Sequence, residues 1–463
     1  MVSPILTIKR RGDRIRGMSN HAKEPISARE ASERVVRRLQ EAGYTAYFAG
    51  GCVRDMIMKM PSDDYDVATD ARPEDVTALF LRTIEVGAQF GVVIVMEDGQ
   101  QVEVATFRSD DAYIDGRHPE SVTFSSPEQD AQRRDFTING LFYDPVAQRI
   151  LDLVGGGKDI EAKIIRAIGD PTARFREDHL RLLRAVRFAA RLGFEIEGET
   201  LRAVRELAPL ITKVSAERIC AELGKMLVDS SRAQAMMLLD STGLLEQVLP
   251  EVCRMKGVEQ PESYHPEGDV FTHSVRCLGF LQKPDFVTAL ATLLHDVGKA
   301  EARSAENGRT TFYRHEIIGE KMARSICGRL KMSRKDTDTA AWLVRKHMIF
   351  KDARNMRESR LKRLFAEDAY DSLEELCRAD ALASTNDLSD CEYCRMRREQ
   401  MSEEEIKPTP LLNGKDLIEM GLKPGPIFSR LLDSVYEEQL EGVLRTKEDA
   451  VEYVRKLLRG RGE

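Results

Sequence analysis

The spacing of hydrophobic positions changes near residue 155. Before that point, apolar runs with strand-like length alternate with stretches of helical periodicity. The expected helices are 27–43, 53–60, 73–81 and 126–140, and the expected strands are 44–49, 91–96 and 101–106. From residue 156 onward nearly every segment has helical periodicity. The pattern predicts an α+β fold, in which a small mixed sheet with helices is followed by helical domains.

A glycine pair and two carboxylates follow the first expected strand. Gly50 and Gly51 lack a Cβ, so the backbone can approach a bulky anion. Arg54 can donate two hydrogen bonds to a phosphate. Asp64 and Asp66, if on a strand, point to the same face, where paired carboxylates suit Mg²⁺. Each feature alone is typical of an ordinary turn or solvated loop, but their order is typical of a nucleotidyltransferase.

A third carboxylate lies on the strand expected at residues 101–106. Alternation places Glu103 on the face opposite Val102 and Val104. Glu103 is therefore a candidate for the third catalytic carboxylate, and an ordinary exposed strand glutamate is the equal alternative.

One aspartate and three arginines recur at every third residue in the segment 177–187. The helical periodicity of its apolar residues predicts a single helix there. The four residues are Asp178, Arg181, Arg184 and Arg187. An aspartate beside an arginine can imitate a template base, because the carboxylate accepts from the amino group of C or A while the guanidinium donates to the neighbouring acceptors. U lacks that amino group, and G presents a donor to the arginine. The alternative is a plain i,i+3 salt bridge.

Histidines and aspartates gather in a second series, in the C-terminal half. Its members are His273, His295, Asp296, His315, His347 and Asp380. The chain has eight histidines, and four of them fall here. Imidazoles and carboxylates from several helices suit a divalent transition metal.

The motifs of the first half resemble the class II tRNA nucleotidyltransferase and bacterial poly(A) polymerase family, whose head is polymerase-β-like. The matching stretches are Phe48–Asp55, Pro61–Val67, Arg133–Gly140 and Arg176–Phe188. The resemblance implies that Asp64 and Asp66 hold two Mg²⁺ ions and that Arg134 contacts phosphate or ribose. It implies that Asp178 and Arg181 face the base, with Arg184 and Arg187 nearer the triphosphate or sugar.

The second series resembles the HD-type phosphohydrolase domain. The resemblance assigns His273, His295, Asp296 and Asp380 as metal ligands. His315 and His347 match positions that hold a second metal or a phosphate in fuller members. The implied substrates are 2′,3′-cyclic phosphates or phosphomonoesters at RNA ends.

The sequence thus predicts an enzyme, a template-independent tRNA 3′-end nucleotidyltransferase that adds CCA from CTP and ATP and carries an accessory HD site. The polar stretch 107–124 resembles a loop of enzymes that add the terminal A. One alternative is an A-adding enzyme or poly(A) polymerase of the same family. Another is an HD phosphohydrolase with a non-catalytic nucleotide-binding head. The aromatic content of 6% argues against a non-enzymatic RNA-binding protein.

Composition and charge add the expected organisation. The expected domains are a disordered basic N-terminus (1–25), the catalytic head (26–155), a neck for nucleotide and RNA binding (156–250), the HD domain (262–400) and a helical tail (408–463). A net charge of −7 excludes a uniformly basic protein, although residues 161–191 are locally basic. Eight scattered cysteines and the lack of a long apolar run predict a cytoplasmic protein without a membrane partner. The role of Cys391 and Cys394 and the oligomeric state are left open.

Overall fold

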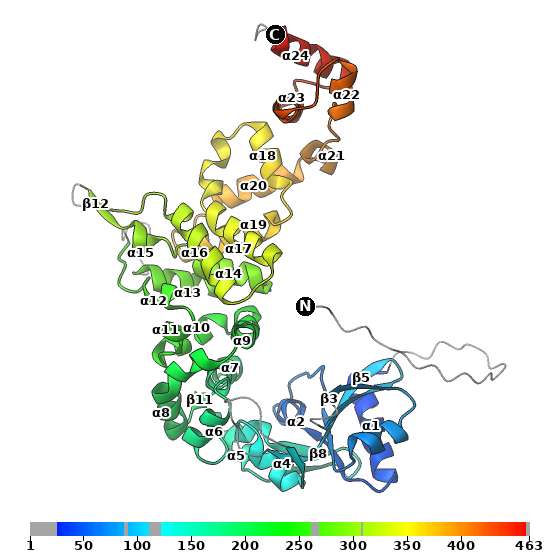
Figure 1. The fold of residues 1–463 in the computed structure, drawn as a ribbon. Coiled ribbons are helices and arrows are strands. Elements are labelled where there is room, and N and C mark those ends of the chain that lie inside the picture. The colour runs from blue at the N-terminus through cyan, green and yellow to red at the C-terminus, as the bar shows by residue number, and fades with distance from the viewer. Residues whose placement is uncertain (1–25, 88–90, 111–121, 261–267, 307–308, 460–463) are drawn as a thin grey trace, which may run out of the picture. The chain divides into compact units, whose positions relative to one another are not determined.

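The computed structural model describes residues 26–87, 91–110, 122–260, 268–306 and 309–459 (Figure 1). Two compact units divide the chain. Of the described residues, the head unit comprises those within 26–109, 122–131 and 139–153. The helical unit comprises residue 110, residues 132–138 and the described residues from 154 to 459. The disordered N-terminus expected at 1–25 and most of the expected loop, 111–121, lie outside the described residues.

The head unit is built on a seven-stranded mixed sheet with the order β3-β4-β5-β2-β1-β8-β9. Its strands are β1 Ala46–Ala49, β2 Val67–Thr69, β3 Thr83–Gly87, β4 Val92–Glu97, β5 Gln100–Thr106, β8 Leu141–Asp144 and β9 Arg149–Asp152, and a separate pair is β6 Arg108–Asp110 with β7 Val122–Phe124. β2 and β5 run parallel, whereas the other neighbours in the large sheet are antiparallel. β4 and β5 form a hairpin, whose turn residues Asp98 and Gly99 both have positive φ.

Short helices accompany this sheet: α1 Ala28–Glu41, α2 Gly51–Ile57, α3 Pro73–Leu79 and α4 Pro127–Arg133. A capping box begins α1: the Ser27 hydroxyl accepts from the Glu30 N–H, and the Glu30 carboxylate accepts from the Ser27 N–H. α1 packs its buried face against β1, β2, β4 and β5. Val102 and Val104 are buried in β5, so Glu103 points to the opposite, exposed face.

Two expected boundaries in this region are wrong. The helix expected over 126–140 ends at Arg133 and is followed by a 3₁₀ helix, Thr137–Asn139. The reason is tertiary, because Phe136 forms a bridge with Ala167 and the Thr137 N–H donates to the Arg166 carbonyl. In addition, Asp64 and Asp66 precede β2 and do not lie within it.

The helical unit has two small strand pairs, β10 Ile164–Ile165 with β11 Glu195–Ile196 and β12 Ser304–Glu306 with β13 Arg309–Thr311. Its first helices are α5 Gly156–Ala162, α6 Pro171–Glu177, α7 Arg181–Leu192, α8 Gly198–Leu207, a 3₁₀ helix Ala208–Lys213, α9 Ala216–Val228, α10 Arg232–Ser241, α11 Leu244–Val248 and α12 Pro250–Cys253. The next are α13 Val270–Phe280, α14 Phe286–Leu294, α15 Lys299–Ala302, α16 His315–Arg329, α17 Arg334–Lys346, a 3₁₀ helix Ile349–Asn355, α18 Glu358–Phe365, α19 Tyr370–Ala383 and α20 Ser389–Glu399. The last are α21 Glu403–Ile406, α22 Gly414–Glu419, α23 Pro426–Leu440 and α24 Lys447–Arg459.

The single helix expected through Glu177–Arg187 is broken, which corrects the sequence prediction. α6 ends at Glu177, Asp178 is extended (φ −140°, ψ 104°), and α7 begins at Arg181. Two side chains hold the break: His179 Nδ1 lies 2.8 Å from the Phe175 carbonyl, and Asp178 Oδ1 accepts from the Leu180 N–H at 3.0 Å.

The tail has a hydrophobic cluster of its own, formed by α22, α23, α24 and the segments that join them. Its buried members are Leu412, Leu417, Leu431, Val435, Leu444, Ala450 and Val454. Within the described residues, no helix is both long and apolar enough to span a membrane.

Candidate functional site

The glycine turn of the head unit lies between β1 and α2. Gly50 has φ +75°, which favours glycine, and its N–H donates to the Leu141 carbonyl at 3.0 Å. Arg54, only 2% exposed, lies beneath this turn: a Cβ added at Gly51 would be 3.7 Å from Arg54 Nη2. Its guanidinium donates to Asp55 Oδ1 at 2.7 Å and to Asn139 Oδ1 at 2.6 Å. The structure therefore gives Arg54 a supporting position, and its contact with a phosphate stays a prediction.

Two of the three predicted carboxylates, Asp66 and Glu103, occupy matching positions beside the parallel pair β2–β5, and Asp64 lies two residues before Asp66. Val67 on β2 is in register with Val104 on β5, so Asp66 and Glu103 each precede a paired valine by one residue. Asp64 is exposed and Asp66 is half-buried. The pKa of Glu103 is raised, first by the protein atoms that shield its carboxyl from water and second by the negative charge of Asp64. A divalent cation would relieve this repulsion, so the residues fit the predicted metal.

Asp178 and Arg181, the predicted base-reading residues, do not pair with each other; each forms an ion pair with a different residue. Asp178 Oδ2 accepts from Arg218 Nη2 at 2.8 Å, and Arg181 Nη1 donates to Glu177 Oε2 at 2.7 Å. Arg181 also donates to the carbonyls of Arg174 and Arg133. Three of its five N–H groups are thus used, and two lack an acceptor among the described residues. The i,i+3 salt bridge between Asp178 and Arg181 does not occur in the described part of the chain.

Two further arginines continue along α7. Arg184 donates to Asp135 at 2.7 Å, and the Asp135 charge raises the pKa of the Arg184 guanidinium. Arg187 lies 2.8 Å from Glu222, and burial lowers its pKa. Arg134, next to Asp135, is half-buried. Asp135 therefore links the Arg-Arg-Asp motif to α7 inside the helical unit.

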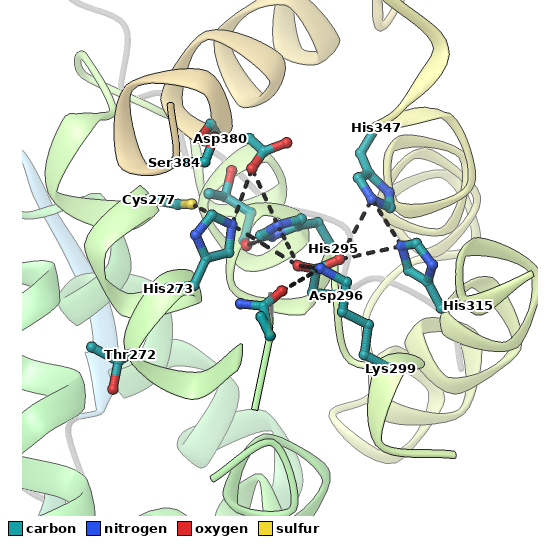
Figure 2. A network of polar contacts seen from close by, with 12 residues as sticks. Thr272, His273, Cys277, His295, Asp296, Lys299, His315, His347, Asp380 and Ser384 are labelled. Atoms are coloured by element: carbon teal, nitrogen blue, oxygen red, sulfur yellow. Dashed lines mark hydrogen bonds and ion pairs between the residues drawn. The ribbon is translucent and has the colours of Figure 1, made fainter. Parts of the chain in front are cut away.

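The HD residues converge from several helices, as Figure 2 shows. A first group of potential ligand atoms comes from His273, Cys277, His295 and Asp380, all within 4.8 Å of one another. His273 Nε2 lies 3.0 Å from Asp380 Oδ1, and His295 Nε2 lies 3.9 Å from the same oxygen. The first three side chains are buried, and that of Asp380 is 14% exposed.

A second group comprises Asp296, His315 and His347. Asp296 Oδ1 lies 3.3 Å from His315 Nε2 and 3.6 Å from His347 Nε2. The Nδ1 atoms of both histidines lie within 2.9 Å of backbone carbonyls, so Nδ1 carries the proton and Nε2 presents a lone pair. The two Nε2 atoms are 3.3 Å apart.

The electrostatics of the HD groups favour a bound cation. Burial lowers the pKa of His347 to about 3, so this histidine is neutral. The pKa of Asp296 is lowered far below its usual range by His295 and Lys299, despite its burial. His295 Nε2 and Asp296 Oδ1 are buried without a hydrogen-bond partner among the described residues. Buried lone pairs of this kind fit a metal ion, which would satisfy them together.

Gly298 and Lys299 lie next to the two ligand groups of the HD domain. A Cβ at Gly298 would lie 2.1 Å from the His315 carbonyl oxygen, so only glycine permits this approach of α15 and α16. Lys299 Nζ lies 2.6 Å from Asp296 Oδ2 and 2.6 Å from Gln260 Oε1. A cavity of about 370 Å³ opens beside these residues, lined among others by Lys299, His347, Lys351 and Asp380.

Sequence reasoning missed several contributors. Cys277, Lys299 and the partners Glu177, Arg218 and Glu222 were not singled out. Cys277 follows His273 by four residues, a spacing that places both on one helix face, and this signal was available. Cys391 and Cys394 are buried in α20, and neither belongs to a three-ligand group among the described residues.

Three family models match consecutive parts of the chain. They are the Poly A polymerase head domain (46–166), the probable RNA and SrmB-binding site of polymerase A (193–256) and the HD domain (270–385). The order of these matches defines a poly(A)-polymerase-type protein with an HD domain.

Comparison with whole proteins shows which kind of poly(A)-polymerase-type protein this chain resembles. The CCA-adding enzyme of Limosilactobacillus fermentum is 31% identical over 422 residues, which are 90% of this chain and 93% of that protein. The CCA-adding enzyme of Geobacillus thermodenitrificans is 46% identical over 211 residues, so the match spans about half (52%) of that relative. The crystal structure of the Bacillus stearothermophilus CCA-adding enzyme in complex with CTP has a TM-score of 0.73 at 29% identity, covering 94% of this chain and 98% of that chain. The chain belongs to the CCA-adding enzyme family. The predicted family and the predicted α+β fold are thus confirmed.

Proposed function

We propose that this protein adds CCA to the 3′ end of tRNA, using CTP and ATP and releasing pyrophosphate. The observation that carries the proposal is the group of carboxylates beside the β2–β5 pair, Asp64, Asp66 and Glu103, in a chain of this family. The relatives named CCA-adding enzymes and the CTP complex of one of them support the same substrates.

The three carboxylates are proposed to hold Mg²⁺, because hard oxygen ligands and a substrate triphosphate are its preferred partners. Divalent ions bound there would activate the tRNA 3′-hydroxyl and neutralise the leaving pyrophosphate. Gly50 and Gly51 carry no Cβ, so the backbone of this turn would be able to approach the phosphates closely. Arg54, fixed by Asp55 and Asn139, adds positive charge beneath the same turn.

Base choice is proposed to rest on Asp178 and Arg181. Arg218 and Glu177 hold the two side chains, so little side-chain entropy is lost when a base binds. The two remaining N–H groups of Arg181 are the donors for C or A, and a carboxylate oxygen of Asp178 accepts from the base amino group. Arg184, Arg187 and Arg134 are proposed to contact the phosphates or sugar.

The HD domain is proposed to be a metal-dependent phosphohydrolase site for RNA-end phosphates. Its ligands would be His273, His295, Asp296 and Asp380, with His315 and His347 at a second position. Asp296 would serve both positions, because its Oδ2 lies 3.3 Å from His295 Nε2 and its Oδ1 lies 3.3 Å from His315 Nε2. Lys299 and Lys351 supply positive charge at the cavity for a phosphate. Burial raises the pKa values of the Cys327 and Cys391 thiols and keeps them protonated, which fits the proposed cytoplasmic location.

The decisive experiment extends three tRNA transcripts, which end before the first C, after the first C and after the second C, with CTP, ATP or both and Mg²⁺. Completion of all three to CCA followed by arrest supports the proposal. Extension of only the transcript that ends in CC, by A alone, overturns it in favour of an A-adding enzyme. A long A tail on any RNA indicates a poly(A) polymerase.

A further inference from the structure

A thiol lies in the first ligand group of the HD domain. His273 and Cys277 are four residues apart on α13, so both side chains project from one face of the helix. Cys277 is fully buried, and its Sγ lies 3.5 Å from His273 Nε2. Figure 2 shows the Cys277 sulfur beside the His273 ring, and the ligand atoms of His273, Cys277, His295 and Asp380 all lie within 4.8 Å of one another.

The separations match a tetrahedral site. Metal–nitrogen and metal–sulfur bonds of about 2.0 and 2.3 Å at a tetrahedral zinc ion separate the two ligand atoms by roughly 3.5 Å. The observed distance from Cys277 Sγ to His273 Nε2 is 3.5 Å. The oxygen of Asp380 lies 3.0 Å from His273 Nε2 and 3.9 Å from His295 Nε2, which brackets the nitrogen–oxygen separation of about 3.4 Å in the same geometry.

A second observation points to a ligand at the same place. His295 Nε2 is buried and has no hydrogen-bond partner among the described residues. Its Nδ1 lies 2.7 Å from the Thr292 carbonyl and therefore carries the proton, so Nε2 presents a lone pair. This lone pair lies near both Asp296 Oδ2, at 3.3 Å, and Asp380 Oδ1, at 3.9 Å. Together the four side chains bring one sulfur, two nitrogens and one oxygen within 4.8 Å of one another.

We propose that Cys277 is a metal ligand, which makes the position formed by His273, Cys277, His295 and Asp380 selective for a thiophilic divalent ion such as Zn²⁺ or Co²⁺. This inference rests on the proposed metal binding of the HD domain. Asp296, His315 and His347 offer only nitrogen and oxygen, so the second position suits a harder ion such as Mn²⁺. Ligation replaces the thiol proton, which leaves to solvent, and forms the sulfur–metal bond.

The test uses the full chain, freed of metal and titrated with Co²⁺. Thiolate ligation gives a near-ultraviolet sulfur-to-cobalt charge-transfer band, which oxygen and nitrogen ligands do not give. We expect the band in the wild type and in Cys327→Ala, a matched buried cysteine of α16 outside both ligand groups, and its loss in Cys277→Ala. Cys277→Ser, the smaller change, is expected to lose the band as well and guards against misfolding.

Competition between metals provides the second measurement. We expect Zn²⁺ affinity to fall roughly ten- to a hundredfold in Cys277→Ser, with Mn²⁺ affinity little changed. Binding of one or more Co²⁺ ions to the wild type without the charge-transfer band overturns the thiol ligand and leaves the metal site intact. Failure of the wild type to bind any Co²⁺ or Zn²⁺ overturns both this inference and the proposed HD metal site.

Discussion

The head carboxylates and the HD cluster are both candidate metal sites. They differ in how much of the metal's coordination shell the protein's own side chains provide. Asp64 is exposed, and it repels Glu103, whose pKa is raised. In the HD domain Asp296 is 2% exposed and is surrounded by histidines and Lys299, so its pKa is lowered. In an open site with excess negative charge, the metal ions and the substrate triphosphate complete the coordination. In a buried site, the protein's side chains must supply the ligands.

The largest expected effect is on nucleotide addition, and it should be specific to the head site. Asp64→Asn should lower nucleotide addition by about a hundred- to a thousandfold or more, because one of few charged ligands is lost. Metal bound by the HD domain should be unchanged. Radioactive CTP and ATP incorporation and elemental analysis measure the two quantities. Asp63→Asn, the exposed neighbour, is the matched control and should keep full activity. Retained addition in Asp64→Asn would refute the catalytic assignment.

The next effect tests how rigidly the HD cluster is built. Gly298→Ala would place a Cβ 2.1 Å from the His315 carbonyl oxygen, so the α15–α16 approach must open. We expect a loss of about 1–3 kcal/mol in the free energy of unfolding and weaker metal binding. Calorimetry with and without metal measures both. Gly328→Ala, in α16 with open space around it, should be neutral or slightly stabilising. Equal behaviour of the two variants would contradict the close approach.

A smaller effect concerns base choice. Arg181→Lys removes the planar fork and keeps the charge, so the preference for C and A over U should fall by roughly ten- to a hundredfold, or about 1–3 kcal/mol. Single-turnover incorporation with each nucleotide measures it. Arg176→Lys, an exposed arginine of α6, is the control. If the two variants discriminate alike, Arg181 is only a structural residue.

The smallest effect is a change in stability with pH at the head site. The pKa of Glu103 is raised in the folded state, so its contribution to stability is present below the unfolded pKa of about 4.3 and is lost as pH rises through the folded pKa. Glu103→Gln should therefore raise the melting temperature of the metal-free protein at pH 7, with the gain vanishing near pH 4. Nucleotide addition should fall at the same time. A lower melting temperature at pH 7 would show that Glu103 is stabilised by a partner.

Much of the local structure was predictable because it depends on local chemistry. Ser27 and Glu30 cap α1, the turn at Asp98 and Gly99 joins β4 and β5, and Val102 and Val104 are buried while Glu103 is not. The helix breaks at 134–136 and 178–180 were not predictable, because periodicity continues through both. They depend on the bridge from Phe136 to Ala167 and on the side-chain bonds of Asp178 and His179.

The sequence alone determined which chemical groups this protein has and their order. Spacing and residue type indicated the metal carboxylates, the aspartate–arginine pairs and the HD ligands, because those chemistries need particular side chains at short separations. Only the tertiary structure decided which residues are partners. Arg181 pairs with Glu177, and Asp178 pairs with Arg218. Cys277 and His273 lie close to Asp380, which is more than a hundred positions away in the chain. The reason is that long-range pairing and burial depend on how helices pack, which no local spacing records.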